Sequence, residues 1–239
     1  MTISEEKPKR FYKAVSVEDS PEGFTVLLDQ RAIKRPDGKP VAVPFKALAD
    51  MICEEWEGQE GFVDLQTMPI TRLAQRACQV DGQERQRLID EVVKYASSDL
   101  LCYRASEPDG LVLRQAKEWQ PLLDWAGDAF GISFDVTTGL SVIAQPEASL
   151  SALRAHVSSL NDFELCGLSP AVALLGSAIL GLALHAKKQN AQEALETSQL
   201  DELWQVEQWG EDEEAAERRK GLNRDLTAIA LFLQSQETN

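Results

Sequence analysis

The sequence predicts an α+β protein in which a small N-terminal β-rich domain is followed by a larger all-helical C-terminal domain. Between about residues 10 and 45, short apolar segments alternate with turn residues, which is typical of strands. Beyond about residue 75, apolar residues recur at helical spacing instead. At 239 residues the chain is long enough for two such parts. We therefore expect a β-rich domain with a following helix at residues 1–75 and a helical bundle at residues 76–239.

The N-terminal segment combines period-two alternation with strong turn signals. The predicted elements are a strand at residues 11–17, a turn at 21–23, a strand at 24–28, a turn at 36–40 and a short strand at 41–43. The second turn is the clearer one, because a proline presets φ and Gly38 supplies a positive φ. From Phe45 onwards the pattern becomes helical.

The remaining chain is dominated by apolar stripes at helical spacing. These stripes are Leu48, Ile52 and Trp56; Leu88, Ile89, Val92, Val93 and Ala96; Trp119, Leu122, Leu123, Ala126 and Phe130; Leu150, Leu153, Val157 and Leu160; and Leu226, Ile229, Ala230 and Leu233. Asp81 followed by Glu84 predicts a capped helix start. Residues 132–142 are expected to be extended.

The segment from Pro170 to His185 is apolar nearly all round. Ser169 and Pro170 form a suitable N-cap and first position for a helix there. At about 15 residues this helix is shorter than the roughly 20 that a bilayer requires. We therefore expect the central helix of a bundle and no membrane insertion.

Composition excludes several classes of partner. The formal net charge is −15, whereas nucleic-acid binding depends largely on Lys and Arg neutralising phosphates. The same charge disfavours an anionic membrane surface. Residues 1–13 contain no apolar stretch typical of a signal peptide, so the expected location is cytoplasmic. Cys53, Cys78, Cys102 and Cys166 are widely spaced and are expected to be reduced thiols.

No catalytic constellation is visible. Neither of the common glycine-rich nucleotide motifs occurs, so no cofactor is expected. His156 and His185 lack the spacing of a metal site and are interpreted as capping or solvated residues. Asp99, Glu107 and Asp109 lie close enough in sequence to pair for acid–base work, but a chain with 39 acidic residues produces such groupings by chance.

Residues 200–219 concentrate carboxylates around two tryptophans. A helix beginning at Ser198, with Ser198 and Asp201 as a cap pair, is predicted here. At about 100° per residue, its apolar arc contains Leu200, Leu203, Trp204 and Val206, and Glu207 falls inside that arc, whereas Trp209 lies nearly opposite. Gly210 is expected to end the helix, with Glu211 and Asp212 in the first turn of the next one.

Three interpretations of Glu207 remain open. The carboxylate binds an arginine or a helix end within the fold, faces a partner beside an exposed tryptophan, or acts as a catalytic acid. The missing nucleophile, base and orienting group favour a structural or interaction role.

Four segments in order resemble a known family. They are RFYKAVSVE with the following residues up to Trp56, MPITRLAQRA at 68–77, YASSDLLCYRA at 95–105 and LWQVEQWGEDEEA at 203–215. Together they resemble the assembly-chaperone family for the α subunit of the catalytic F(1) sector of ATP synthase, and the absence of a presequence fits a bacterial member. The resemblance implies an ATP-independent chaperone that holds the free α subunit and shields its subunit interface until it pairs with β.

The resemblance also implies that Glu207 occupies a functionally important acidic position. The residues expected to bind the partner are Trp204, Glu207, Trp209, Glu211 and Asp212. A transient chaperone is expected to be monomeric, because a permanent self-interface would compete for its binding surface. Two alternatives remain: a small carboxylate-dependent hydrolase or isomerase with its site at the domain junction, and a generic regulatory scaffold.

Overall fold

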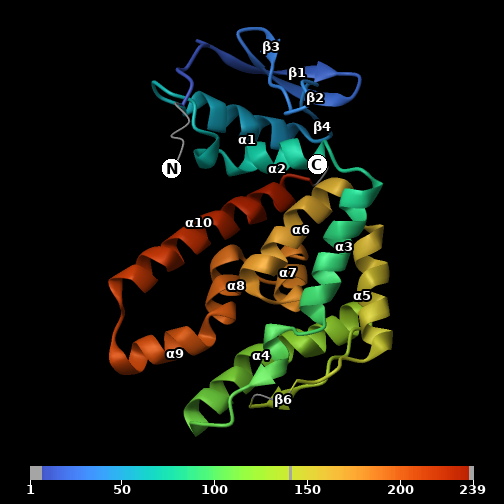
Figure 1. Cartoon of the computed structure of the whole chain (residues 1–239), viewed down its shortest axis with the longest axis vertical. Coiled ribbons are helices and arrows are strands. Elements are labelled where there is room, and N and C mark those ends of the chain that lie inside the picture. Colours follow the sequence, from blue (N-terminus) through green and yellow to red (C-terminus); the bar gives the residue numbers. More distant parts are fainter. Residues whose placement is uncertain (1–6, 140–141, 237–239) are drawn as a thin grey trace, which may run out of the picture. The chain divides into compact units, whose positions relative to one another are not determined.

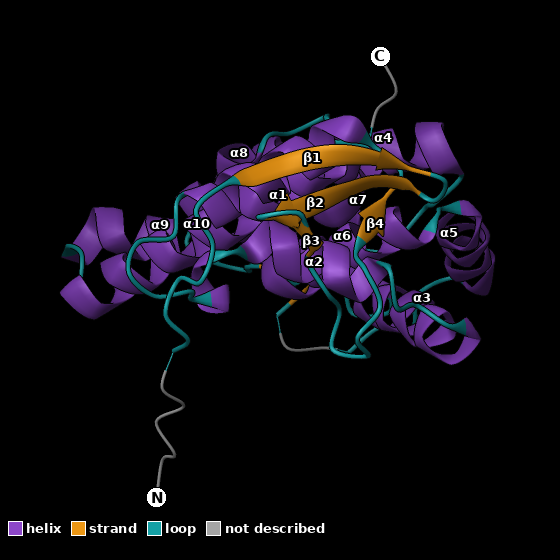
Figure 2. Cartoon of the chain, turned by 90° about the horizontal axis from the view of Figure 1, so that it is seen from above, coloured by secondary structure: helices purple, strands orange, loops and turns teal. Residues whose placement is uncertain are grey.

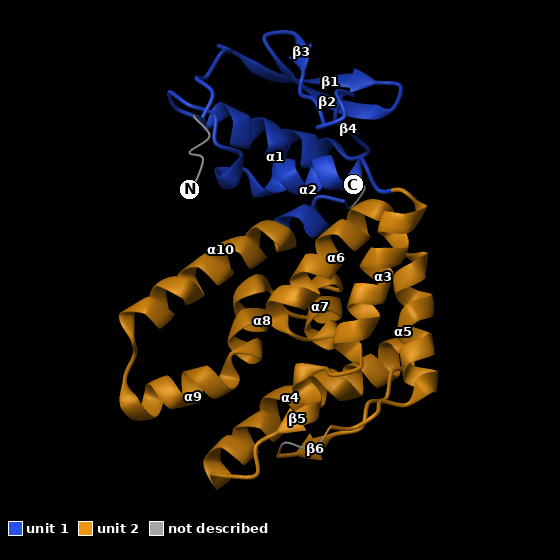
Figure 3. Cartoon of the chain, in the orientation of Figure 1, with its two compact units in different colours: residues 1–80, 231–239 blue, residues 81–230 orange. Residues whose placement is uncertain are grey.

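The computed structural model describes residues 7–139 and 142–236 (Figure 1). Strands β1 to β4 lie in the N-terminal region and helices dominate the rest, which confirms the predicted α+β class. The chain forms two compact units, one with the residues up to Val80 and from Leu231 onwards, the other Asp81–Ala230 (Figure 3). The boundary expected between residues 75 and 76 lies within helix α2, Pro69–Ala77.

The first unit contains a small antiparallel sheet. Its strands are β1 (Val15–Ser20), β2 (Gly23–Leu28), β3 (Arg31–Ala32) and β4 (Ala42–Val43). β2 pairs with each of the other three strands. Gly23 has φ +121°, and a Cβ there would lie 2.4 Å from the carbonyl oxygen of Val43, so the tight connection between β1 and β2 requires glycine.

The first strand begins later than the predicted range of 11–17. The carboxylate of Asp29 accepts hydrogen bonds from the backbone N–H of Lys13, at 3.0 and 3.1 Å, and of Ala14, at 2.9 Å. Because a side chain takes these two donors, the backbone before Val15 does not continue the ladder with β2. The strand at 24–28 and the turn before it are confirmed.

The helices of the first unit pack on one another and on the sheet. They are α1 (Lys46–Glu57), the 3₁₀ turn η1 (Leu65–Thr67) and α2 (Pro69–Ala77). Figure 2 shows β1 and β2 side by side over α1. The predicted face of α1 is confirmed, since Leu48, Ile52 and Trp56 are buried. Glu55 accepts the backbone N–H groups of Ile70 and Thr71 at 2.7 Å and so caps the start of α2 from the neighbouring helix.

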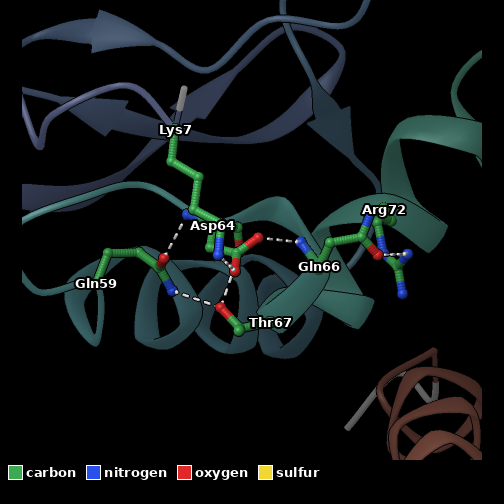
Figure 4. A network of polar contacts seen from close by, with 6 residues as sticks. All are labelled: Lys7, Gln59, Asp64, Gln66, Thr67 and Arg72. Carbon is green, nitrogen blue, oxygen red and sulfur yellow. Dashed lines mark hydrogen bonds and ion pairs between the residues drawn. The ribbon is translucent and has the colours of Figure 1, made fainter. Parts of the chain in front are cut away.

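A polar network orders the loop between α1 and α2 (Figure 4). Asp64 accepts hydrogen bonds from Lys7 Nζ at 2.6 Å and from the backbone N–H of Gln66 at 3.0 Å. These bonds, that from Lys7 foremost, hold the pKa of Asp64 below its usual range. Gln59 accepts the N–H of Asp64 at 2.8 Å and donates to Thr67 at 3.2 Å. Side chains thus satisfy the backbone N–H groups of Asp64 and Gln66 in this loop.

The second unit is a helical assembly. Its elements are α3 (Gly82–Ala96), the 3₁₀ turn η2 (Leu100–Cys102), β5 (Tyr103–Arg104), α4 (Asp109–Phe130), β6 (Thr137–Thr138), α5 (Glu147–Ser159), α6 (Asp162–Leu175), α7 (Ala178–His185), α8 (Ala191–Ser198), α9 (Leu200–Trp209) and most of α10 (Glu213–Gln234). The predicted cap at Asp81 is confirmed, because its carboxylate accepts from the N–H groups of Gln83 and Glu84. β5 and β6 pair in parallel; of the segment predicted to be extended, residues 140–141 lie outside the described residues.

The predicted helix from Pro170 to His185 is wrong in its start and its continuity. α6 begins eight residues before Pro170, because Asn161 and Glu164 form a capping box there. Gly176, at φ +66°, ends α6, and Ser177 then caps α7. A glycine in the left-handed region is a frequent helix terminator, so the apolar run folds as two helices. Within the described part of the chain, no helix combines the length and apolar character needed to cross a bilayer.

Candidate partner-binding site

The carboxylates suggested for acid–base work do not form a site. Asp99 is fully buried and accepts hydrogen bonds from Ser177 Oγ at 2.7 Å and from the N–H of Ile179 at 3.1 Å. Burial raises its pKa to about 6. Glu107 and Asp109 are exposed, so the structure separates them from Asp99. Asp99 has no access to a substrate, and its bonds tie η2 to the start of α7.

The histidines and cysteines are embedded in the helical packing. His185 lies in the last turn of α7, with Nε2 3.4 Å from Glu164 Oε1. The ring of His156 lies 4.4 Å from that of Phe130, and burial lowers the pKa of His156. Cys102 and Cys166 are buried cysteines that form no disulfide. Across residues 7–139 and 142–236, no group of three or more His, Cys, Asp or Glu side chains is arranged to hold a metal ion.

Helix α9 carries the charged stretch, but its start differs from the prediction. The hydroxyl of Ser198 donates to the carbonyl oxygen of Leu195 at 2.8 Å and closes α8. Gln199 is the N-cap of α9 and makes no side-chain cap bond. Asp201 instead accepts from Nε2 of the buried Gln115 at 2.7 Å. The predicted cap pair of Ser198 and Asp201 is therefore wrong, because both side chains are engaged elsewhere.

One edge of the apolar arc of α9, at Trp204, faces α4, whereas the other edge, at Val206, lines a hollow with residues of α10. Leu200 is buried, and Leu203, Trp204 and Val206 are half-buried. Trp204 lies against Gly110 of α4, where an added Cβ would be only 2.6 Å from the indole Cη2. The absence of a side chain at Gly110 thus allows the two helices to meet at this tryptophan.

Glu207 forms an ion pair with Arg114 of α4. Nη1 of Arg114 donates to the two carboxylate oxygens of Glu207 at 2.7 and 2.8 Å. The first of the three interpretations, an arginine within the fold, therefore describes the free chain. The side chains of Glu207 and Arg114 nevertheless remain 51% and 34% exposed, so both are accessible to a partner.

Beyond Glu207 the chain becomes open to solvent. Trp209 is 79% exposed, and Gly210 at φ +89° ends α9 as predicted. Glu211 precedes α10 and forms an ion pair with Arg219. Asp212 accepts the N–H of Ala215 at 3.0 Å and caps α10, which begins at Glu213. The prediction that Glu211 and Asp212 lie in the first turn is thus wrong by one to two residues, although both remain beside the helix's positive end.

Three hollows lie beside α9. The largest of them, about 570 Å³, lies between α4, α8 and α9 and is called here the α9 groove. Its lining residues are Arg114, Glu118, Lys188, Gln189, Glu193, Glu196, Thr197, Leu200, Leu203 and Glu207. The second, about 290 Å³, lies between α8, α9 and α10 and includes Leu203 and Glu211. The third, about 280 Å³, lies at the turn from α9 to α10 and includes Trp209 and Asp212. Trp204 belongs to none of these linings and acts as an anchor for α9.

Sequence reasoning missed the residues of α4 that hold α9. Gly110, Arg114 and Gln115 lie far from α9 in sequence and carry no motif. The only signal was the position of Glu207 within an apolar arc, which required some cation nearby.

Comparisons with known proteins agree with this two-part fold. Residues 9–127 match the family described as ATP12 chaperone protein. The crystal structure of Atp12 from Paracoccus denitrificans is similar at 35% sequence identity, with 96% of this chain and 99% of that chain covered and a TM-score of 0.91. The chain belongs to the ATP12 chaperone family. ATP12 chaperones act in assembly of the F(1) sector of ATP synthase, and the resemblance inferred from the sequence is confirmed.

Two further relatives extend this ATP12 similarity. Protein Atu1473 from Agrobacterium tumefaciens is 40% identical, with 96% of this chain and 87% of that one covered and a TM-score of 0.91. The mitochondrial protein atp12 of Schizosaccharomyces pombe is 27% identical over an alignment of 237 residues, and 94% of this chain and 81% of that protein are covered. Similarity to ATP12 proteins therefore extends over nearly the whole chain.

Proposed function

We propose that this protein is an ATP-independent, non-enzymatic assembly chaperone that binds the free α subunit of the F(1) sector and shields its subunit interface until β arrives. The observation that carries the proposal is the similarity to ATP12 proteins along nearly the whole chain. That the partner is the α subunit is inferred from the family resemblance of the four sequence segments. We further propose that the protein is cytoplasmic and works as a monomer.

The proposed contact surface is the exposed side and the end of α9. Trp209 is almost fully exposed, and a tryptophan can bury a large apolar area at an interface. Glu211 and Asp212 follow Trp209 closely in the turn to α10, whereas Glu207 lies on nearly the opposite side of α9. The three carboxylates supply negative charge that selects basic groups on the partner. Trp204 supports this surface from behind through its contact with Gly110.

The test is co-purification with isolated α and β subunits. Wild-type protein is expected to retain α and not β, and Trp209→Ala is expected to bind α about thirty-fold more weakly, since truncation of a hot-spot tryptophan costs about 2 kcal/mol or more. The exposed position makes a large loss of fold stability unexpected. Leu113→Ala on α4 is a matched control, because Leu113 is 70% exposed and lines none of the three hollows beside α9. Retention of β alone, or of neither subunit, would contradict the proposed function.

A further inference from the structure

The α9 groove has an excess of negative charge. Four glutamates line it, Glu118, Glu193, Glu196 and Glu207, against two cations, Arg114 and Lys188. Glu193 accepts the backbone N–H of Asn190, and Glu196 accepts from Gln192. Neither of these bonds neutralises a carboxylate's charge. Lys117, outside the lining, lies 3.8 Å from Glu118 and is a third cation near these carboxylates. Four glutamates against three cations leave the groove with a negative excess that attracts a further cation.

Arg114 is the cation now bound to Glu207, and the pair is weakly held. Both side chains are at least one-third exposed, and exposed ion pairs contribute little because water solvates the separated charges almost as well. Glu207 can therefore exchange Arg114 for another cation at small cost. Leu203 also lines the groove, so an apolar wall is available for the aliphatic stem of an incoming side chain.

We propose that the α9 groove receives an arginine or lysine side chain of the free α subunit, which displaces Arg114 from Glu207. The inference rests on the proposed function, because it names the chemistry by which that partner is recognised. In the free chain Arg114 acts as an internal competitor that keeps Glu207 neutralised. Binding then depends on a carboxylate at this place on α9, and not on the Glu207–Arg114 pair as a structural link.

The proposal makes opposite predictions for the two partners of the pair. Arg114→Gln removes the competitor and is expected to raise affinity for the α subunit two- to five-fold, the factor that corresponds to an exposed pair of up to about 1 kcal/mol. Glu207→Gln removes the carboxylate that the partner uses and is expected to lower affinity about ten-fold or more. A purely structural pair would make both variants weaker.

A charge swap distinguishes the need for a carboxylate on α9 from the need for an ion pair between α4 and α9. In the double variant Arg114→Glu with Glu207→Arg, an internal pair can still form, but the cation now stands on α9. Affinity is expected to fall at least ten-fold, whereas a merely structural pair would leave it unchanged. The matched controls are Arg154→Gln and Asp90→Asn, since these residues form an exposed interhelical pair at 2.6 Å, with side-chain exposures of 43% and 52%, outside the groove.

Affinity is measured by titration of labelled full-length chaperone with isolated α subunit, after circular dichroism has confirmed the fold of each variant. Two results would overturn the inference and leave the proposed function standing, provided that the wild type binds the α subunit. One is an unchanged affinity of the swap variant, and the other is a lower affinity of Arg114→Gln than of the wild type. No binding by wild type overturns the function itself. If the swap variant does not fold, opposite effects of the two single variants support the inference and effects in the same direction refute it. Self-association that Glu207→Gln abolishes would assign the groove to a second copy and also refute it.

Discussion

Asp99 gives a stability test whose size follows from its environment. Burial raises the pKa of this carboxyl from the ordinary 3.8 to about 6, against the lowering effect of the Ser177 and Ile179 hydrogen bonds. The folded state therefore binds a proton more tightly than the unfolded state does. The contribution of Asp99 to stability is greatest below pH 3.8 and falls as pH rises, until it levels off above about pH 6. The full change is about 3 kcal/mol, from about 1.4 kcal/mol per pH unit.

The perturbation is Asp99→Asn, which removes the titration while keeping the side chain's size. Between pH 5 and 7.5, a window above the pI of 4.6, wild type is expected to lose about 1 kcal/mol of unfolding free energy relative to the variant. Asparagine would point an amide donor at one of the N–H groups from which Asp99 accepts a hydrogen bond, so the variant can be less stable at every pH. Such a constant loss does not change the direction of the pH-dependent difference.

Urea denaturation followed by tryptophan fluorescence measures this difference. Four of the five tryptophans lie in the same unit as Asp99. Asp90→Asn is the control, because hydrogen bonds from Arg154 and Gln86 lower the pKa of the exposed Asp90 and its titration lies below the window. Parallel pH profiles for wild type and Asp99→Asn would refute the raised pKa and the argument from burial.

Two further predictions concern the contacts between helices. Gly110→Ala is expected to destabilise the protein by about 1–3 kcal/mol through overpacking against Trp204, whereas Gly127→Ala, whose Cβ meets nothing closer than 3.7 Å, is expected to stabilise it by about 0.5–1 kcal/mol. Equal changes in melting temperature would contradict this contrast. Arg85→Ala is expected to cost about 1–3 kcal/mol, because Arg85 donates to the carbonyl oxygens of Ser158 and Leu160 at the end of α5. A urea midpoint that is unchanged by this substitution would show that solvent replaces those bonds.

The sequence correctly predicted the elements whose formation depends on residues that are close together in the chain. The stripe of Leu48, Ile52 and Trp56, the cap at Asp81 and the helix end at Gly210 depend on neighbouring residues only, and all three are confirmed. The start of β1 depends on Asp29, which takes backbone donors about fifteen residues away. The period-two alternation of residues 11–17 contains no sign that the side chain of Asp29 takes these backbone donors.

The candidate site shows the same division more sharply. Its position on α9 followed from one carboxylate inside an apolar arc, which the sequence displays. Its partners did not, because Arg114 lies 93 residues from Glu207 and Gly110 contributes only by lacking a side chain. Chain folding brings such residues together without leaving a pattern, so a sequence can show that a charge needs a partner without showing which.

The attachment of α9 to α4 explains why Glu207 can serve both the fold and a partner. Asp201, Trp204 and Glu207 are spaced three residues apart and lie on one side of α9, and each contacts α4. The first two contacts involve the buried Gln115 and the side-chain-free Gly110, so α9 remains positioned even when the outermost contact opens. Partner binding at Glu207 then requires one side chain, Arg114, to move rather than the helix, which keeps the conformational entropy lost on binding small. The contacts of Asp201 and Trp204 thus hold α9 in place before the partner binds, and only the contact of Glu207 with Arg114 has to be exchanged.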